Sequence, residues 1–246
     1  MIVLDIIDSE FGTIEVLQRR LSGSLLYRQG GVLQSEADSA GASLASYIHA
    51  IFGLILQNNA HNVLVIGCGG GTLATMLAQS GRDVTVIDIN PASFAIARKY
   101  FRLPVTVTCH VSDGKSFLRR SRELYDAIVI DAYNGGRLPA HLESLEFFDL
   151  ARRRLPAAGS VFANVHLQNE SDRHADEISA CMGGIWNNVR ILDSEIALDR
   201  NAIVMGGDVR RLETPTVIIQ PAIDAELIER ELLSMKFRPC RTNIRM

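Results

Sequence analysis

A strand that runs directly into a cluster of glycines constrains the fold more than any other feature of the sequence. The apolar run Val63–Ile66 is followed by four glycines within five positions and then by a predicted helix that begins at Thr72. Glycine lets the backbone turn tightly and approach a ligand closely, and a helix N-terminus offers free N–H groups. A purely structural turn between a strand and a helix can have the same sequence pattern, so the loop alone does not show that a ligand binds there. Its residues are candidates for cofactor binding: Gly67, Cys68, Gly69, Gly70 and Gly71.

The alternation of apolar strand, turn and helix continues beyond this loop. Strands are predicted at residues 84–87, 105–108, 127–130, 160–165 and 202–205, with a further possible strand at 189–192, and helices at 72–79, 91–100, 114–119 and 172–186. Apolar strands that alternate with helices predict a mostly parallel twisted sheet covered by helices on both faces. The fold class is therefore α/β and Rossmann-like.

The N-terminal region has a different pattern. Short β-type runs at Thr13–Leu17 and Ser24–Tyr27 are separated by glycine-containing turns, which is typical of antiparallel strands. A helix is predicted next, over residues 42–57. We expect a small N-terminal β module at residues 1–40 and a nucleoside-binding Rossmann-like domain at residues 41–246.

An acidic residue ends the second strand of the predicted domain. Asp88 follows Val84–Ile87 and lies 17 residues beyond Gly71, a position from which a carboxylate accepts hydrogen bonds from both ribose hydroxyls. Asn90, beside Pro91, can cap the following helix and leaves Asp88 for a ligand. Spacing therefore favours a nucleoside site over a purely structural turn.

Two further acids follow later strands. Asp113, within Ser112-Asp113-Gly114, is placed to accept a hydrogen bond from an adenine amino group, although Asp before Gly is also common in structural turns. Asp131 and Tyr133 lie at the C-terminal end of the strand 127–130. Ligands of open α/β sheets lie at this edge of the strands.

Composition and charge exclude several classes of protein. A net charge of −3 supplies no positive field for nucleic acid. The four cysteines are scattered without a CxxC pair, so neither a zinc site nor a disulfide framework is predicted, and no metal is expected. No apolar run approaches the length of a membrane span, and the first residues carry no signal-type basic region. We expect a cytoplasmic protein without nucleic-acid or membrane partners.

In this combination the sequence resembles the spermidine synthase, or polyamine aminopropyltransferase, family, which shares the class I methyltransferase fold. The resemblance runs from Ser9 to Val165. Besides the glycine loop it rests on segments 34–38 (QSEAD), 86–88 (VID), 112–114 (SDG), 125–131 (YDAIVID), 138–142 (LPAHL) and 146–148 (EFF).

The resemblance implies roles for individual residues. Asp88 would hold the ribose, Asp113 the adenine, and Asp131 would face the sulfonium or the incoming amine. By the same resemblance Ile89, Ser112 and Gly114 would adjoin the nucleoside, and Tyr133 would join Asp131 in catalysis. Gln34, Asp38 and Asn134 would contact the acceptor, and four aromatic side chains are further candidates for its pocket: Tyr27, Tyr47, Tyr133 and His166.

The chain also departs from the family pattern. The family's glycine loop carries an aspartate that grips the aminopropyl ammonium, whereas this loop contains only Cys68 and glycines. Asn134 stands where the family has a second catalytic aspartate, and an amide cannot accept a proton at neutral pH. No Tyr-His-Glu cluster matching the family's is evident around residues 41–44.

Three functions remain open from the sequence. The first is a divergent spermidine synthase-like transferase with S-adenosylmethionine or its decarboxylated form as cosubstrate, a small-molecule amine as acceptor, and a homodimeric assembly. The second is an S-adenosylmethionine-dependent methyltransferase, favoured by the loop without a carboxylate, since an added acid would repel the carboxylate of that donor. The third is a catalytically inactive nucleoside-binding or structural homologue. NAD binding is disfavoured because the loop lacks a clean G-x-G-x-x-G.

Overall fold

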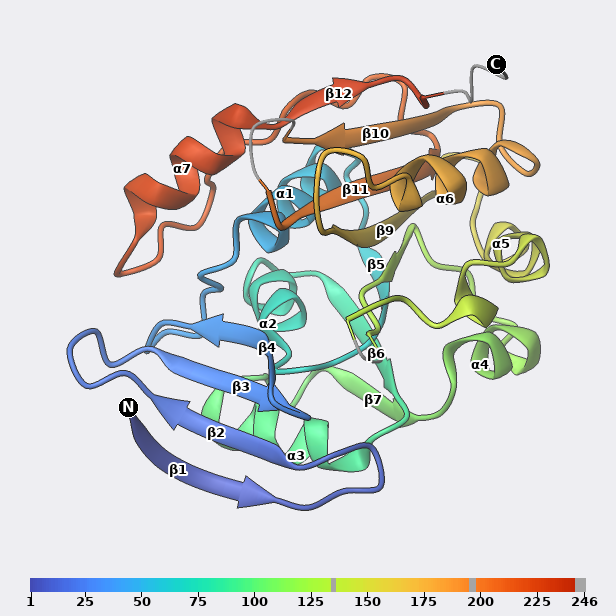
Figure 1. Cartoon of the computed structure of the whole chain (residues 1–246). Coiled ribbons are helices and arrows are strands. Elements are labelled where there is room, and N and C mark those ends of the chain that lie inside the picture. Colours follow the sequence, from blue (N-terminus) through green and yellow to red (C-terminus); the bar gives the residue numbers. More distant parts are fainter. Residues whose placement is uncertain (134–135, 195–197, 242–246) are drawn as a thin grey trace.

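The computed structural model describes residues 1–133, 136–194 and 198–241, and these residues form two sheets (Figure 1). The N-terminal sheet is antiparallel, with its strands in chain order: β1 (Ile2–Ile7), β2 (Ile14–Gln18), β3 (Leu25–Gln29) and β4 (Val32–Ala37). Two of these strands, β1 and β4, were not assigned from the sequence, because their exposed side chains give no clean alternation of apolar and polar residues.

The larger sheet has the order β12-β10-β11-β9-β8-β5-β6-β7. Its parallel part contains β5 (Asn62–Ile66), β6 (Asp83–Asp88), β7 (Thr108–Val111), β8 (Ala127–Ile130) and β9 (Ser160–Leu167). The strands β11 (Arg200–Gly207), β10 (Val189–Asp193) and β12 (Lys236–Arg238) follow antiparallel to their neighbours. The predicted α/β class is confirmed.

Helices cover both faces of this sheet. One face packs mainly against α1 (Ser46–Gln57), α2 (Thr72–Gln79), α3 (Pro91–Tyr100) and α7 (Ala225–Ser234). The other packs against α4 (Gly114–Arg120), the short 3-10 helix η1 (Ala140–Leu142), α5 (Leu145–Arg152) and α6 (His174–Gly183). Because β5 and β8 are buried on both sides, they are continuous apolar runs, as parallel strands require.

Two predicted boundaries are wrong. The strand expected at residues 105–108 lies at Thr108–Val111, because Pro104 and Val107 form a turn in which Val107 is buried by packing and not by a sheet. The helix expected from residue 42 begins at Ser46, since residues 38–45 follow a course fixed by hydrogen bonds to Asp38 and Ser43.

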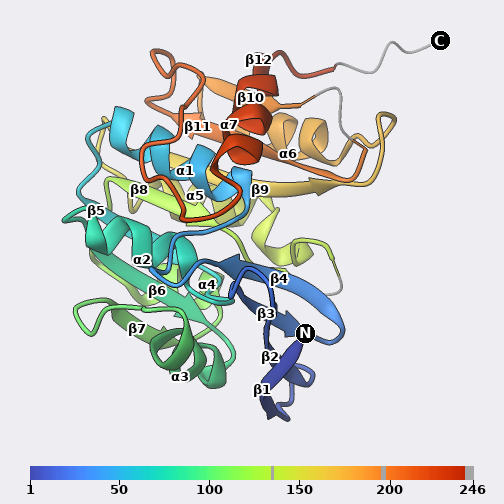
Figure 2. The same ribbon diagram turned by 90° about the vertical axis from the view of Figure 1, so that its left-hand side faces the viewer.

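The N-terminal sheet packs on α3, beside the open edge of the glycine loop (Figures 1 and 2). Ile14, Val16 and Tyr27 of the small sheet are fully buried against Ile96 and Phe101. A boundary near residue 40 remains our proposal, since β4 ends at Ala37 and α1 already belongs to the core of the larger sheet. Within the described residues, no helix is long and apolar enough to cross a membrane.

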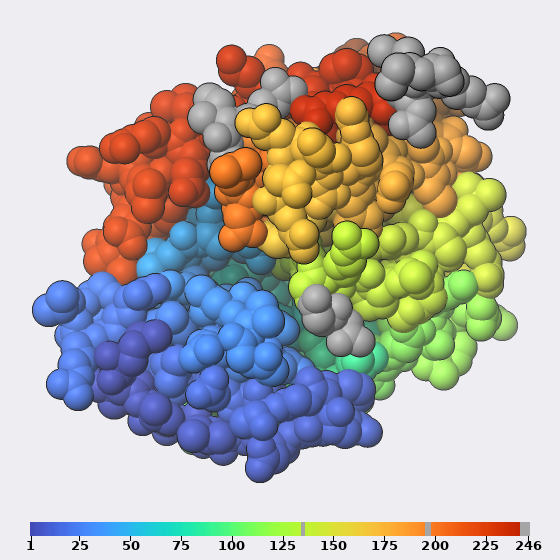
Figure 3. Space-filling model, in the orientation of Figure 1, coloured from blue at the N-terminus to red at the C-terminus, as the bar shows by residue number. Residues whose placement is uncertain are grey.

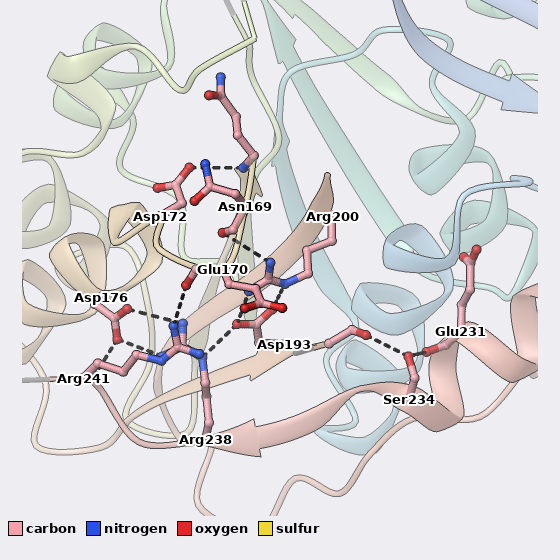
Figure 4. Close-up of polar contacts among 12 residues, drawn as sticks. Asn169, Glu170, Asp172, Asp176, Asp193, Arg200, Glu231, Ser234, Arg238 and Arg241 are labelled. Atoms are coloured by element: carbon pink, nitrogen blue, oxygen red, sulfur yellow. Dashed lines mark hydrogen bonds and ion pairs between the residues drawn. The ribbon is translucent and has the colours of Figure 1, made fainter. Parts of the chain in front are cut away.

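A cluster of buried ion pairs fastens β12 to the rest of the sheet (Figure 4). Asp193 at the end of β10 accepts from Arg200 Nε at 2.7 Å and from Arg238 Nε at 2.8 Å. Arg238 also donates from Nη1 to Asp176 of α6 at 2.8 Å. The side chains of Asp193 and Arg238 are 0% and 7% exposed, so neither charge is screened by solvent.

We expect Arg238→Leu to destabilise the fold by about 3 kcal/mol, because removing one partner leaves buried carboxylates short of a counter-charge. For a chain of this size the melting temperature should fall by about 6–12 °C in calorimetry. Lys236→Leu, an exposed position on the same strand, is the matched control and should change it by about 2 °C or less. Equal small effects of both variants would show that the cluster does not stabilise β12.

Candidate functional site

The site lies at the C-terminal ends of the neighbouring parallel strands β5 and β8. From β5 the chain continues to β6 and β7 on one side, while β8 and β9 lie on the other, so the strand order reverses between β5 and β8. Ligands of open α/β sheets bind at such a switch point. Gly67 follows β5 with φ of +101°, and a Cβ there would lie 2.1 Å from the Asp131 carbonyl oxygen. Only glycine allows this approach.

The glycine loop is held from the N-terminal sheet. The N–H of Gly70 donates to Ser35 Oγ of β4 at 3.0 Å, and a Cβ on Gly70 would lie 2.9 Å from the Ser35 Cβ. Gly69 and Gly71 have φ of +49° and +70°, a region that favours glycine. Helix α2 then begins without a side-chain cap, which leaves its first N–H groups facing the loop. Burial raises the pKa of the Cys68 thiol.

Asp88 lies at the end of β6 beside this loop. Its carboxylate accepts from the N–H of Cys68 and from the N–H of Asn90, both at 2.7 Å. Burial raises the pKa of Asp88 even though these N–H groups favour its charged form. Asn90 caps α3 through the Ala92 N–H, as predicted. Ile89, next to Asp88, is 48% exposed. The ribose role of Asp88 stays a prediction.

Asp113 lies between β7 and α4, as the N-cap residue of α4. It caps α4 by accepting from the Ser116 N–H at 2.8 Å, and its other oxygen lies 2.6 Å from His141 Nε2. Burial opposes ionisation, but these partners lower the pKa of Asp113. A Cβ at Gly114 would lie 2.5 Å from Ile66, which explains glycine there by packing. Ser112 Oγ accepts from Arg120 at 3.0 Å. Contact of Ser112, Asp113 and Gly114 with adenine stays a prediction.

Asp131 follows β8 and is the most perturbed carboxyl of the site. Its Oδ1 accepts from Asn164 Nδ2 of β9 at 2.8 Å, and the Tyr47 hydroxyl of α1 faces it. Burial raises the pKa of Asp131 to about 6, although Asn164 and Tyr47 favour the charged form. Ser35, Gly67 and Cys68 line a narrow cavity with Asp131. A carboxyl that titrates near neutrality, in a cavity beside a glycine loop, has the properties of an acid–base group.

Tyr133 continues the chain from Asp131. Its hydroxyl donates to the Asn164 carbonyl at 2.8 Å, and burial raises its pKa. The surface is hollowed between the N-terminal sheet and the segments that follow β8 and β9 (Figure 3). His166 lies on β9 two residues beyond Asn164 and pairs with Asp199 at 2.6 Å.

The predicted acceptor residues are not all brought to this place. Gln34 lies at the glycine loop, with Oε1 3.9 Å from the position of a Gly69 Cβ. Asp38 is buried, and its carboxylate accepts from the N–H groups of Ala40, Ala42 and Ala222, which are structural contacts. Asn134 lies outside the described residues.

Tyr27 is fully buried, its hydroxyl donates to Gln29 Oε1 at 2.9 Å, and its pKa is raised by burial and also by the nearby Asp88 and Cys68. Its place in an acceptor pocket stays a prediction.

The sequence analysis missed two contacts of the site. Ser35 supports the glycine loop, and Asn164 holds Asp131. Asn164 could have been noticed as an amide inside the otherwise apolar strand Ser160–Leu167. Such a buried amide is costly unless it is hydrogen-bonded. Among the described residues, no group of three or more His, Cys, Asp or Glu side chains is arranged to hold a metal.

Comparison with known proteins agrees with this geometry. Residues 63–159 match a family model described as a methyltransferase domain. The chain is 27% identical over 179 residues to a probable polyamine aminopropyl transferase of Bifidobacterium longum, covering 72% of this chain and 40% of that protein. It is 30% identical over 181 residues to an N-terminal histidine N-methyltransferase of Emericella nidulans, covering 64% of this chain and 32% of that protein.

A solved structure extends the likeness to almost the whole chain. The crystal structure of a probable spermidine synthase from Corynebacterium glutamicum superposes with a TM-score of 0.79 at 21% identity, over 96% of this chain and 90% of that one. The chain thus has the spermidine synthase-like form of the class I methyltransferase fold, and the resemblance seen in the sequence is confirmed. It spans less than half the length of the curated relatives named above.

The raised pKa of Asp131 predicts a pH-dependent cost to stability. Its folded-state pKa, about 6, exceeds the ordinary value of 3.8, so its contribution to stability is present below about pH 4 and is lost as pH rises through 6. The free energy of unfolding of Asp131→Asn, relative to that of the natural protein, should therefore increase by about 1–2 kcal/mol as the pH rises from 4.5 to 8.

Chemical denaturation across that range measures this gain. Glu10→Gln, at an exposed carboxyl, is the control, and its difference in stability from the natural protein should change by about 0.5 kcal/mol or less over the same range. A pH-independent difference between Asp131→Asn and the natural protein would show that Asp131 is ionised as easily in the fold as in water.

Proposed function

We propose that this chain is a spermidine synthase-like transferase that moves a carbon group from a sulfonium donor, decarboxylated S-adenosylmethionine or S-adenosylmethionine, to an amine. The observation that carries the proposal is the partly buried carboxyl of Asp131, with a pKa of about 6, in the cavity beside the glycine loop at the switch point. Relatives named as aminopropyl transferase and as N-methyltransferase support the same class of reaction.

The residues present fit a nucleoside sulfonium. Glycine at positions 67, 69 and 70 lets the loop pack closely against Asp131 and Ser35, and the start of α2 has no side-chain cap, so its first N–H groups remain available to a ligand. Asp88 and Ile89 would lie along the ribose, and the segment Ser112-Asp113-Gly114 along the adenine. When bound, the donor supplies an electrophilic carbon next to a positive sulfur.

Asp131 would then handle the proton of the acceptor. The amine nitrogen forms the new C–N bond as the C–S bond breaks, the electron pair of that bond goes to sulfur, and a neutral thioether leaves. The new ammonium gives one proton to the Asp131 carboxylate, which is ionised above pH 6. Tyr47 and Tyr133, with Gln34, would orient the amine from the sides of the hollow.

A second candidate, methyl transfer, rests on one specific observation. Residues 67–71 of the loop carry no carboxylate, so the loop holds nothing to pair with an aminopropyl ammonium and nothing to repel an amino-acid carboxylate. Asp131 lines the same cavity as Gly67 and Cys68 and would have to pair with the ammonium if the decarboxylated donor is used. A homodimer in the cytoplasm completes the proposal, in line with the resemblance.

Thermal shift with three ligands separates these candidates. At a hundredfold excess over Kd, a ligand bound only to the fold adds about 2.7 kcal/mol, or about 5–10 °C for this size of chain. We expect shifts with methylthioadenosine, S-adenosylmethionine and its decarboxylated form, and a marked loss of all three in Asp88→Ala.

The order of the shifts then identifies the donor. A larger shift with the decarboxylated form supports aminopropyl transfer, and the reverse order supports methyl transfer. If folded, ligand-free protein shifts with none of the three, the chain has no nucleoside site of this kind and the proposal is wrong.

Turnover provides the second test, on Asp131→Asn. An amide cannot take up the amine proton, so we expect kcat to fall about 100-fold or more with donor affinity changed about twofold or less, since the loss falls in the transition state. In the natural protein kcat should decline below about pH 6 because the carboxylate becomes protonated. Full turnover by Asp131→Asn with the identified acceptor would remove Asp131 from the chemistry.

A further inference from the structure

An asparagine pair on neighbouring strands leads from the surface to Asp131. Asn164 lies on β9 and is 1% exposed, with apolar neighbours on both sides along the strand. Asn201, on the adjacent antiparallel strand β11, is half-buried and donates from Nδ2 to Asn164 Oδ1 at 2.9 Å. Asn164 in turn donates from Nδ2 to Asp131 at 2.8 Å. Both the oxygen and the NH2 group of the buried Asn164 amide are therefore hydrogen-bonded.

The direction of these bonds is set by a backbone carbonyl, which can only accept. The Tyr133 hydroxyl donates to the Asn164 carbonyl at 2.8 Å, so its oxygen is left to accept, and the Asn201 side chain bonds to it. Asn201 must therefore turn its NH2 toward Tyr133 and Asn164. Asn164 then has to present its oxygen to Asn201 and its NH2 to Asp131.

A reversed Asn164 amide would lose both of its bonds. Its NH2 would face the NH2 of Asn201, and its oxygen would face the Asp131 carboxylate. An oxygen at that place favours a protonated carboxyl, whereas an NH2 favours the ionised one. The half-buried Asn201 thus determines whether the oxygen or the NH2 group of the Asn164 amide faces Asp131.

We propose that Asn201 is a positioning residue that acts through Asn164: it locks the Asn164 amide with its NH2 toward Asp131, and so keeps that carboxylate ionised and aimed at the acceptor amine. The catalytic consequence rests on the function proposed above, whereas the locking itself does not. Hydrogen bonds to the charged form explain why Asp131, despite its burial, remains a base at neutral pH.

The other groups that face Asp131 come from different elements. Tyr47 of α1 and Tyr133 of the same segment are its titratable neighbours, and burial raises the pKa of both phenols, so they stay neutral at neutral pH. Glu143 acts on Tyr133 from the segment before α5. Asn201 also bonds to Tyr133, so the comparison with Asn164→Leu is needed to separate the asparagine pair from an effect through Tyr133.

The test is carboxyl-carbon NMR on the full chain with labelled aspartate, titrated between pH 4.5 and 8. Comparison with Asp131→Asn identifies the Asp131 signal. We expect Asn201→Leu to raise its midpoint by about 0.5–1 unit and Asn164→Leu by about 1 unit, the effect of losing one hydrogen bond to a charge. If Asn201 acts through Asn164 and not through Tyr133, the double variant should match Asn164→Leu alone.

Ser160→Ala is the matched control. It removes another buried side-chain bond of β9, the one from Asn58, at the far end of the strand. It should lower the melting temperature without moving the Asp131 midpoint. If Asn164→Leu does not fold, the Asp131 midpoint measured in Asn201→Leu, a change at a half-buried position, still tests the inference.

Three results would overturn the inference. These are an Asp131 midpoint unchanged in Asn201→Leu, effects of the two variants that add fully, or an equal shift in Ser160→Ala. Once an acceptor is known, the acid limb of kcat should move upward with the midpoint while donor Kd stays within about twofold, which a merely structural role would not produce. A moved midpoint in a protein that consumes no acceptor would refute the proposed function and support the locking of Asp131.

Discussion

The approach of two backbone segments at the sheet's switch point is the constraint on which the rest of the site depends. The chain after β5 passes so close to the chain after β8 that residue 67 has no room for a Cβ beside the Asp131 carbonyl. This approach brings the glycine loop and the Asp131 carboxyl to one cavity. A side chain at position 67 would push β8 away and would separate the glycine loop from the Asp131 carboxyl.

Elements far apart in the sequence hold this arrangement from two sides. The N-terminal sheet presses Ser35 onto the loop at Gly70, and α3 anchors that sheet through Phe101. On the other side, the antiparallel strands extend the sheet, and the Asp193 ion pairs secure its last strand. Asn201 reaches Asn164 only because β11 is antiparallel to β9 and lies directly beside it. The extra strands therefore complete the polar surroundings of Asp131 as well as the core.

Sequence reasoning reached the fold class and the strand ends because both rest on local patterns. Gly67 lies in the loop that follows β5 and Asp88 is the last residue of β6, as their positions after apolar runs predict. The contacts of Ser35 and Asn164 were not predicted, since each residue meets the site through a contact between distant segments. The contacts of Asp38 could not be predicted for a related reason: its carboxylate accepts from three backbone N–H groups of residues that only the fold brings together.

Two partly buried carboxyls of the site, Asp88 and Asp131, differ in the groups that surround them, and each set of surroundings suits a different task. Burial raises the pKa of both Asp88 and Asp131. Backbone N–H groups of the glycine loop and of residues 89–90 surround Asp88, and a rigid frame of this kind holds a carboxylate in one place for a ligand. Asp131 is bonded instead by the neutral side chains of Asn164 and Tyr47, and with these partners its pKa lies at about 6. The same fold therefore offers one fixed acceptor and, 43 positions later, one group able to exchange a proton near neutral pH.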